Sequence, residues 1–109
     1  MWNTNDNIIK LLEQSTKKED GISYICPVCN EKEAHVYYHR FEEDDIAGPA
    51  WGWCSACKSY THVRYMIPKW WTNLPTIDEE SLCSSPEYLE SIKSTIDEHM
   101  DMILKNISE

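Results

Sequence analysis

Two Cys-x-x-Cys pairs limit what this chain can fold into more than any other feature does. Cys26 and Cys29 enclose Pro-Val, Cys54 and Cys57 enclose Ser-Ala, and 24 residues lie between the pairs. Each short spacing lets one tight turn present two thiolates to a single ion, and a hairpin can bring the two turns together. Zinc prefers soft sulfur ligands and a tetrahedral arrangement. We therefore predict one structural Zn²⁺ ion held by these four cysteines.

Other uses of the same cysteines remain open from the spacing alone. Two disulfides, four free thiols or a rubredoxin-like iron site would also fit the pattern. The chain has no apolar run of membrane-spanning length, and its first residues lead straight into polar sequence without a secretory signal. We therefore expect a cytoplasmic protein, in which reduced thiols favour metal binding over disulfides. The fifth cysteine, Cys83, has no evident base near it in sequence, so we expect a buried or inactive thiol.

The sequence Cys-Pro-x-Cys followed by Cys-x-x-Cys-Lys resembles the zinc-ribbon, or zinc-knuckle, family over about residues 22–67. The resemblance implies a three-stranded antiparallel sheet that carries two knuckles, and it says almost nothing about function. Knuckles of this family usually have Gly after the second cysteine, where this chain has Asn30 and Lys58. Because Asn tolerates a left-handed backbone and Lys does so less readily, we expect a regular first knuckle and a less regular second one.

The remaining pattern predicts an α+β fold in a single domain. Residues 1–21 form an N-terminal helix and linker, residues 22–75 the zinc ribbon, and residues 76–109 an acidic C-terminal helix. Capping residues followed by apolar residues predict a helix over about 5–17. β-Branched and aromatic runs predict strands over 22–25, 35–41, 50–54 and 60–67. Gly52, between two tryptophans of the central strand, suggests close approach of another element.

The C-terminal part has the clearest helical pattern. Ser85 is positioned to cap a helix whose first residue is Pro86. Apolar residues then recur at steps of three and four, which predicts a core-facing stripe on a helix over about 86–107. The stripe consists of Leu89, Ile92, Ile96, Met100, Ile103 and Ile107.

The charge distribution bears on possible partners. The net charge is −9, and residues 76–109, with nine acidic and two basic residues, account for −7 of it. An anionic surface repels phosphate backbones, which argues against nucleic acid and favours a basic protein partner. Four consecutive carboxylates stand in the loop after the second predicted strand, at Glu42, Glu43, Asp44 and Asp45. The loop is either a solvated tip or an anionic finger for a cationic cleft.

The five Trp and six Tyr residues are the second informative feature of the composition. A thin ribbon buries most such rings, but Trp and Tyr also dominate binding hot spots. Trp70 and Trp71 are adjacent, so in an extended segment they point to opposite sides. We expect one of them to pack inward and the other to be available as an anchor.

No catalytic constellation stands out. His35 and His39 share a strand face, and His62 could join them from a neighbouring strand, but no nucleophile, paired carboxylate or phosphate-binding Gly loop accompanies them. A zinc ion with four thiolates has no open position for water. We therefore expect a protein that is not an enzyme.

These features favour a small zinc-binding protein that acts by binding another protein. Small size, acidity and many aromatic residues resemble the immunity proteins that neutralise bacterial toxin domains, often nucleases. On this resemblance the partner contacts would be Glu42, Glu43, Asp44 and Asp45, with Trp70 or Trp71 as anchor. One alternative is a nucleic-acid or transcription-associated ribbon with contacts at Arg40, Lys58, Arg64 and Lys69. Another is a zinc-stabilised subunit of a larger assembly, docked through the C-terminal helix.

Overall fold

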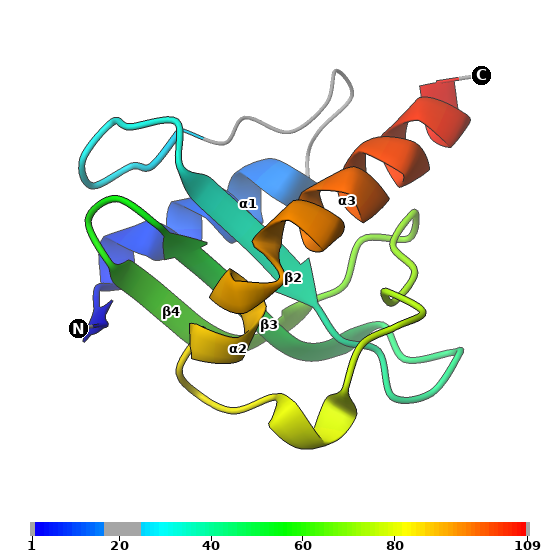
Figure 1. The fold of residues 1–109 in the computed structure, drawn as a ribbon. Helices are drawn as coiled ribbons and strands as arrows, with labels where there is room; N and C mark the ends of the chain where they lie inside the picture. Colours follow the sequence, from blue (N-terminus) through cyan, green and yellow to red (C-terminus); the bar gives the residue numbers. More distant parts are fainter. Residues whose placement is uncertain (1, 17–24, 109) are drawn as a thin grey trace.

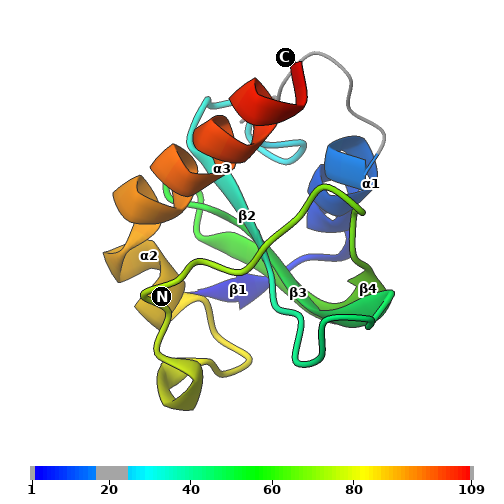
Figure 2. The same ribbon diagram turned by 90° about the vertical axis from the view of Figure 1, so that its right-hand side faces the viewer.

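The computed structural model describes residues 2–16 and 25–108. The fold is mixed α+β: a four-stranded sheet has helices on both of its faces (Figures 1 and 2). The strands are β1 (Asn3–Thr4), β2 (Ala34–Tyr38), β3 (Ala47–Cys54) and β4 (Ser59–Met66), in the spatial order β1-β4-β3-β2. β2, β3 and β4 form an antiparallel meander, and β1 pairs in parallel with the outer edge of β4.

The predicted antiparallel strands over 35–41, 50–54 and 60–67 are present with shifted bounds, and the three-stranded sheet is corrected to four strands. β1 consists of two polar residues, which carry no strand pattern in the sequence. The second strand ends at Tyr38 rather than Phe41. At that point the side chain of Asn73 accepts from the Arg40 N–H (2.8 Å) and donates to the Arg40 carbonyl (2.6 Å), which takes the backbone away from β3. Most of the strand expected over 22–25 lies outside the described residues.

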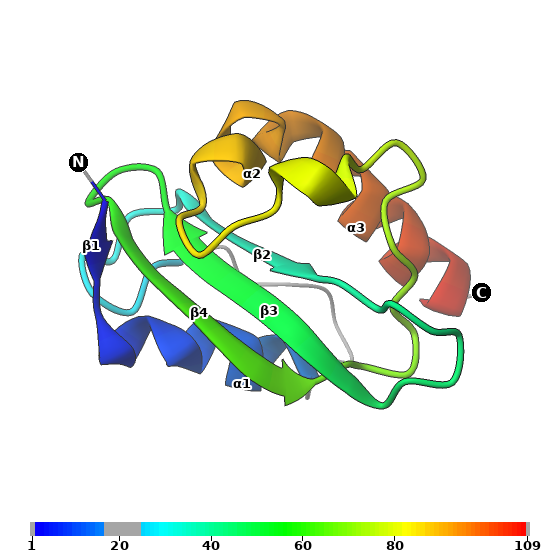
Figure 3. The ribbon, with the colours of Figure 1, turned by 90° about the horizontal axis from the view of Figure 1, so that it is seen from below.

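One face of the sheet is covered by the N-terminal helices η1 (Asp6–Ile9) and α1 (Lys10–Thr16) (Figure 3). The side chain of Asn5 caps η1 by accepting from the Asn7 N–H at 3.0 Å. Ile8, Leu11 and Leu12 are fully buried beneath the sheet. Gly52 marks the contact, because a Cβ atom there would lie 3.6 Å from the Ile8 carbonyl oxygen and from Leu11 Cβ.

The other face is covered by the C-terminal part, which contains η2 (Glu79–Ser81), α2 (Glu87–Ser91) and α3 (Lys93–Ser108) (Figure 3). The single helix predicted over 86–107 is broken at Ile92, whose backbone (φ −118°, ψ 21°) leaves the helical region. The predicted cap is also wrong. Pro86 itself occupies the N-cap position of α2, and no side chain, that of Ser85 included, caps the helix.

The predicted apolar stripe of the C-terminal helices does face the sheet. Leu89, Ile96 and Met100 are buried, and Ile92 and Ile103 pack against the core with part of their surface exposed. The side chain of Ile107 is outside the described residues. Among the described residues, no helix has both the length and the apolar character needed to cross a membrane.

Aromatic rings fill the layer between the sheet and the C-terminal part. Tyr37, Trp51, Trp53 and Trp71 are at most 2% exposed, and the rings of Tyr37 and Trp71 meet edge to face at 5.3 Å. Trp51 donates from Nε1 to the Cys83 carbonyl at 2.7 Å, which fastens the segment before α2 to the sheet. The strands run between two ends of the molecule. The cysteine turns lie at one end, and the β2–β3 loop lies at the other (Figure 3).

Candidate metal centre and the two ends of the sheet

The four predicted cysteines come together at one end of the sheet. Their sulfur atoms all lie within 4.8 Å of one another, and the pairs Cys26–Cys57 and Cys29–Cys54 are each 3.7 Å apart. A zinc ion at about 2.3 Å from four tetrahedral sulfurs would place them about 3.8 Å apart. A disulfide would need about 2.05 Å, and all four thiols are free. The four cysteines could therefore hold one metal ion.

Two turns of the same backbone conformation present the sulfurs. Asn30 and Lys58 have φ values of 64° and 60°, and their N–H groups donate to the carbonyls of Cys26 (2.9 Å) and Cys54 (3.0 Å). The expectation that Lys58 makes the second knuckle irregular is therefore wrong. The turn demands a left-handed residue at this position, and Lys58 adopts it although it has a Cβ atom.

The surroundings of the sulfurs favour a bound cation. Burial raises the pKa of Cys54 to about 12 and also raises that of Cys26. Burial raises the pKa of Cys57 too, but hydrogen bonds from the Ser59 hydroxyl and backbone outweigh it and bring the pKa to about 7. Buried thiols of this kind become thiolates when a metal ion supplies the compensating charge. Binding of an ion would therefore stabilise the thiolate form of the buried sulfurs, and the four cysteines could hold one.

A polar network that the sequence did not reveal ties the second knuckle to the C-terminal helices. Its centre is the hydroxyl of Ser55, between two of the cysteines. Ser55 Oγ lies 3.1 Å from Nε2 of His35, 2.5 Å from Oε1 of Glu90 and 3.2 Å from Nζ of Lys93. The other ring nitrogen of His35, Nδ1, lies 3.0 Å from Oδ1 of Asp97. Three residues, one from β2 and two from the C-terminal helices, thus meet at one serine.

Asp97, His35 and Ser55 stand in the carboxylate–imidazole–hydroxyl order of a serine hydrolase. The hydrogen bonding of Ser55 differs from a nucleophile's, however. Its single proton goes to Glu90 at 2.5 Å, and Lys93 donates to the same oxygen. A nucleophile would give that proton to the imidazole instead. The network therefore has the order of a triad but the bonding of a structural anchor.

The three histidines do not form the cluster considered from the sequence. His62 stacks on Trp51 with ring centroids 4.5 Å apart. His39 is fully buried near the opposite end from the cysteines, where its Nε2 lies 3.2 Å from Oε1 of Glu79. Within the described part of the chain, the four cysteines are the only group of His, Cys, Asp and Glu residues gathered closely enough to hold a metal ion.

The acidic loop lies at the end of the sheet away from the cysteines. Glu42, Glu43 and Asp44 are exposed, while Asp45 is half-buried and accepts from the Glu42 N–H at 3.1 Å. Beneath the loop, the guanidinium of Arg40 donates to the carbonyls of Asp45, Pro68 and Trp71 at 3.1, 3.2 and 2.7 Å. The loop is therefore a braced turn rather than a free tip.

Of the two adjacent tryptophans, Trp71 is fully buried and Trp70 is half-buried. Trp71 is thus a core residue, and of the two only Trp70 has surface available for a partner. Three further residues around the acidic loop were not evident from the sequence as part of a surface. Phe41, Ile46 and Met66 are 62%, 75% and 64% exposed. The sequence did contain a signal for this surface, because large apolar residues stand next to the run of charged residues.

The basic residues of the nucleic-acid alternative do not gather on one free face. Arg40 is committed to three carbonyls, and Lys58 lies over the Trp2 ring at 4.8 Å and 3.9 Å from Glu90. Arg64 and Lys69 are exposed, but Lys58 and Lys69 follow opposite ends of the sheet. Cys83, expected to be buried or inactive, is exposed, and its thiol lies 3.4 Å from the Ser85 carbonyl.

Comparisons with protein-family models, with curated protein sequences and with solved structures found no match to this chain. The geometry of its own residues therefore carries the functional argument.

Proposed function

We propose that this chain is a zinc-stabilised protein that works by binding a basic protein partner. The observation that carries the proposal is the mixed surface around the acidic loop. Three exposed carboxylates, Glu42, Glu43 and Asp44, stand among three exposed apolar side chains, Phe41, Ile46 and Met66. Binding surfaces combine apolar contacts, which supply affinity, with charges, which supply orientation and association rate.

The metal has a structural role in this proposal. Four thiolates would leave a zinc ion no open position for water, so the ion supplies no hydrolytic chemistry. It joins the segment before β2 to the β3–β4 turn and thereby fixes the end of the sheet remote from the binding surface. A sheet held in this way keeps the acidic loop in one conformation, which lowers the entropic cost of binding.

Within this class we propose an immunity or inhibitor protein for a basic toxin domain, such as a nuclease. A nuclease binds phosphates with clustered cations, and a braced loop of carboxylates is electrostatically complementary to such a cleft. The net charge of −9 would also attract a basic partner. The Asp97–His35–Ser55 arrangement is assigned a structural rather than a catalytic role, because Glu90 takes the serine proton.

The experiment compares partner capture by three forms of the protein in lysate of its native host. The loop variant carries Glu42→Gln, Glu43→Gln and Asp44→Asn. The control carries Glu31→Gln, Glu87→Gln and Glu98→Gln, three exposed carboxylates elsewhere, so that both variants lose the same charge. We expect a basic protein that the wild type and the control retain and the loop variant loses.

Inhibition by the purified pair then completes the test. The captured protein should be toxic or nucleolytic alone and lose that activity on addition of the wild-type chain, with weaker association at high salt. Equal capture by the two variants would contradict the binding surface. A captured protein whose activity is unaffected by the chain would contradict the inhibitor role.

A further inference from the structure

An open cavity of about 620 Å³ lies beside the acidic loop, between it and the segment that leads to η2. Carboxylates dominate its charged lining, and the ring of Phe41 supplies an apolar wall. Arg40 is the single cation among the described residues around it, and its guanidinium is already bonded to three carbonyls. The lining residues are Arg40, Phe41, Glu42, Glu43, Thr72, Asn73 and Glu79.

A buried chain of hydrogen bonds leads to this cavity. The Leu74 N–H hydrogen-bonds to the Tyr37 hydroxyl, which lies 3.4 Å from Nδ1 of His39. Because the Tyr37 hydroxyl already accepts from the Leu74 N–H, its own proton is available for Nδ1 of His39. In a neutral imidazole the proton then resides on Nε2. His39 therefore directs an N–H donor at Glu79.

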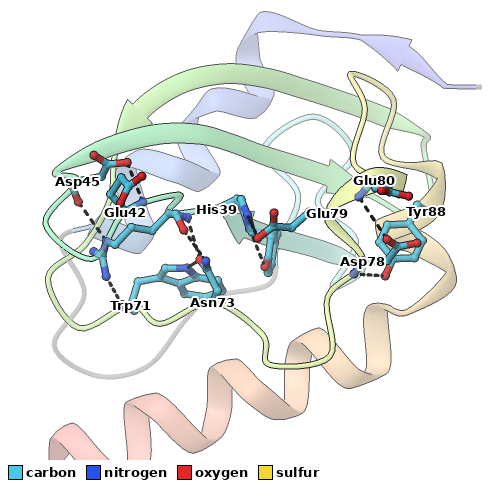
Figure 4. A network of polar contacts seen from close by, with 11 residues as sticks. His39, Glu42, Asp45, Trp71, Asn73, Asp78, Glu79, Glu80 and Tyr88 are labelled. Carbon is cyan, nitrogen blue, oxygen red and sulfur yellow. Dashed lines mark hydrogen bonds and ion pairs between the residues drawn. The ribbon is translucent and has the colours of Figure 1, made fainter.

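The last link of this chain is incomplete. Nε2 of His39 lies 3.2 Å from Oε1 of Glu79 (Figure 4), yet the alignment falls short of a hydrogen bond. His39 is fully buried, and a buried N–H without an acceptor is unfavourable. Glu79 is itself 62% exposed, so its carboxylate is free to turn. A cation bound to the outer oxygen of Glu79 would hold the carboxylate in place and let the inner oxygen accept from His39.

We propose that this cavity binds the guanidinium group of an arginine side chain on the protein partner. A guanidinium is planar, so it can lie against Phe41 while its N–H groups reach the carboxylates of Glu79 and Glu42 or Glu43. A lysine ammonium offers neither the flat face nor the paired donors. The proposal rests on the proposed protein-binding function and specifies the side chain that the acidic end of the sheet recognises.

The test is an NMR titration of the ¹⁵N-labelled protein with acetyl-Gly-Arg-Gly-amide. The matched peptide contains citrulline, which keeps the shape of arginine and lacks its charge. We expect amide shifts in residues 41–43 and 72–79 with the arginine peptide and none with the citrulline peptide. Glu79→Gln should weaken binding at least tenfold, and Glu98→Gln, an exposed carboxylate on α3, should leave it unchanged.

Equal shifts with the two peptides, shifts confined to other residues, or equal affinities of the two variants would overturn the proposal. The amide spectrum of Glu79→Gln also shows whether that variant is folded, and Phe41→Ala, at an exposed site, offers a second variant with an expected severalfold loss. The titration uses no partner protein. If it fails while partner capture succeeds, the cavity assignment alone is lost. If capture fails while the arginine peptide binds, the proposed inhibitor function is lost instead.

Discussion

The hydroxyl of Ser55 lies 3.1 Å from Nε2 of His35, and this contact joins the second knuckle to the edge strand β2. Glu90 and Lys93 meet the same hydroxyl from α2 and α3. The second cysteine turn is thus bonded to the C-terminal helices through a serine hydroxyl that Glu90 and Lys93 share.

We expect Ser55→Ala to lower the free energy of unfolding by about 1–3 kcal/mol, because it leaves half-buried polar groups without their shared partner. Urea unfolding followed by circular dichroism measures the change. Ser94→Ala, at an exposed position of α3, is the matched control and should change stability by less than about 0.5 kcal/mol. Equal unfolding midpoints for the two variants would contradict the anchor role.

The same residue decides whether the Asp97–His35–Ser55 arrangement is catalytic. With its proton given to Glu90, Ser55 is not activated by the imidazole, so we expect no Ser55-dependent hydrolysis of p-nitrophenyl acetate. The measurement compares wild-type protein with Ser55→Ala and Ser94→Ala. Activity that disappears in the first variant and persists in the second would show an enzyme.

The two strand glycines at 48 and 52 make a matched pair that tests the packing of the sheet. A Cβ atom at Gly48 would lie 2.6 Å from the His39 carbonyl oxygen, whereas at Gly52 the nearest atoms are 3.6 Å away. Gly48→Ala must therefore displace backbone, at a cost of about 1–3 kcal/mol, and Gly52→Ala meets ordinary contacts. Thermal unfolding of both variants measures this, and a Gly52→Ala loss as large as that of Gly48→Ala would contradict the packing described.

The pKa of His62 should lie below its ordinary value of 6.5, because partial desolvation where the imidazole stacks on the Trp51 ring disfavours its charged form. The residue as a whole is exposed, so the effect on stability is small. The unfolded chain then binds its proton more readily than the folded one, so this contribution to stability is present above pH 6.5 and is lost as the pH falls through the folded pKa. NMR titration of the imidazole rings measures the pKa. His62→Gln should reduce the pH dependence of stability between about pH 7 and 5. A His62 pKa above 6.5 would contradict the expectation.

Much of the fold could be predicted because its signals are local. The Cys-x-x-Cys spacings located the knuckles, and the β-branched and aromatic runs located the three main strands. β1 pairs with Ser59 and Tyr60 of β4, a long-range contact that nothing in residues 3–4 indicates. The helix break at Ile92 could not be predicted either, because the apolar stripe continues across it. Only the backbone angles of Ile92 show the break.

The candidate sites also differ in whether local sequence or tertiary packing forms them. The four cysteines were evident from spacing, whereas Ser55, His35, Glu90 and Asp97 are brought together by tertiary packing of elements that lie up to 62 residues apart. A meeting of the histidines was open from the sequence, because two of them share a predicted strand face. In the structure His39 lies beyond the end of β2, with its Nε2 3.2 Å from Glu79, so a common face did not mean a common site.

The most direct test of the account is the metal content of the purified chain. Native mass spectrometry with elemental analysis should find one zinc ion per chain, absent from Cys26→Ser and from Cys54→Ser, and retained in Cys83→Ser. Chelation should unfold the ribbon, because metal binding and folding are coupled. A metal-free wild-type chain whose circular dichroism is unchanged by chelator would contradict the claim that four cysteine sulfurs around one zinc ion hold this sheet together.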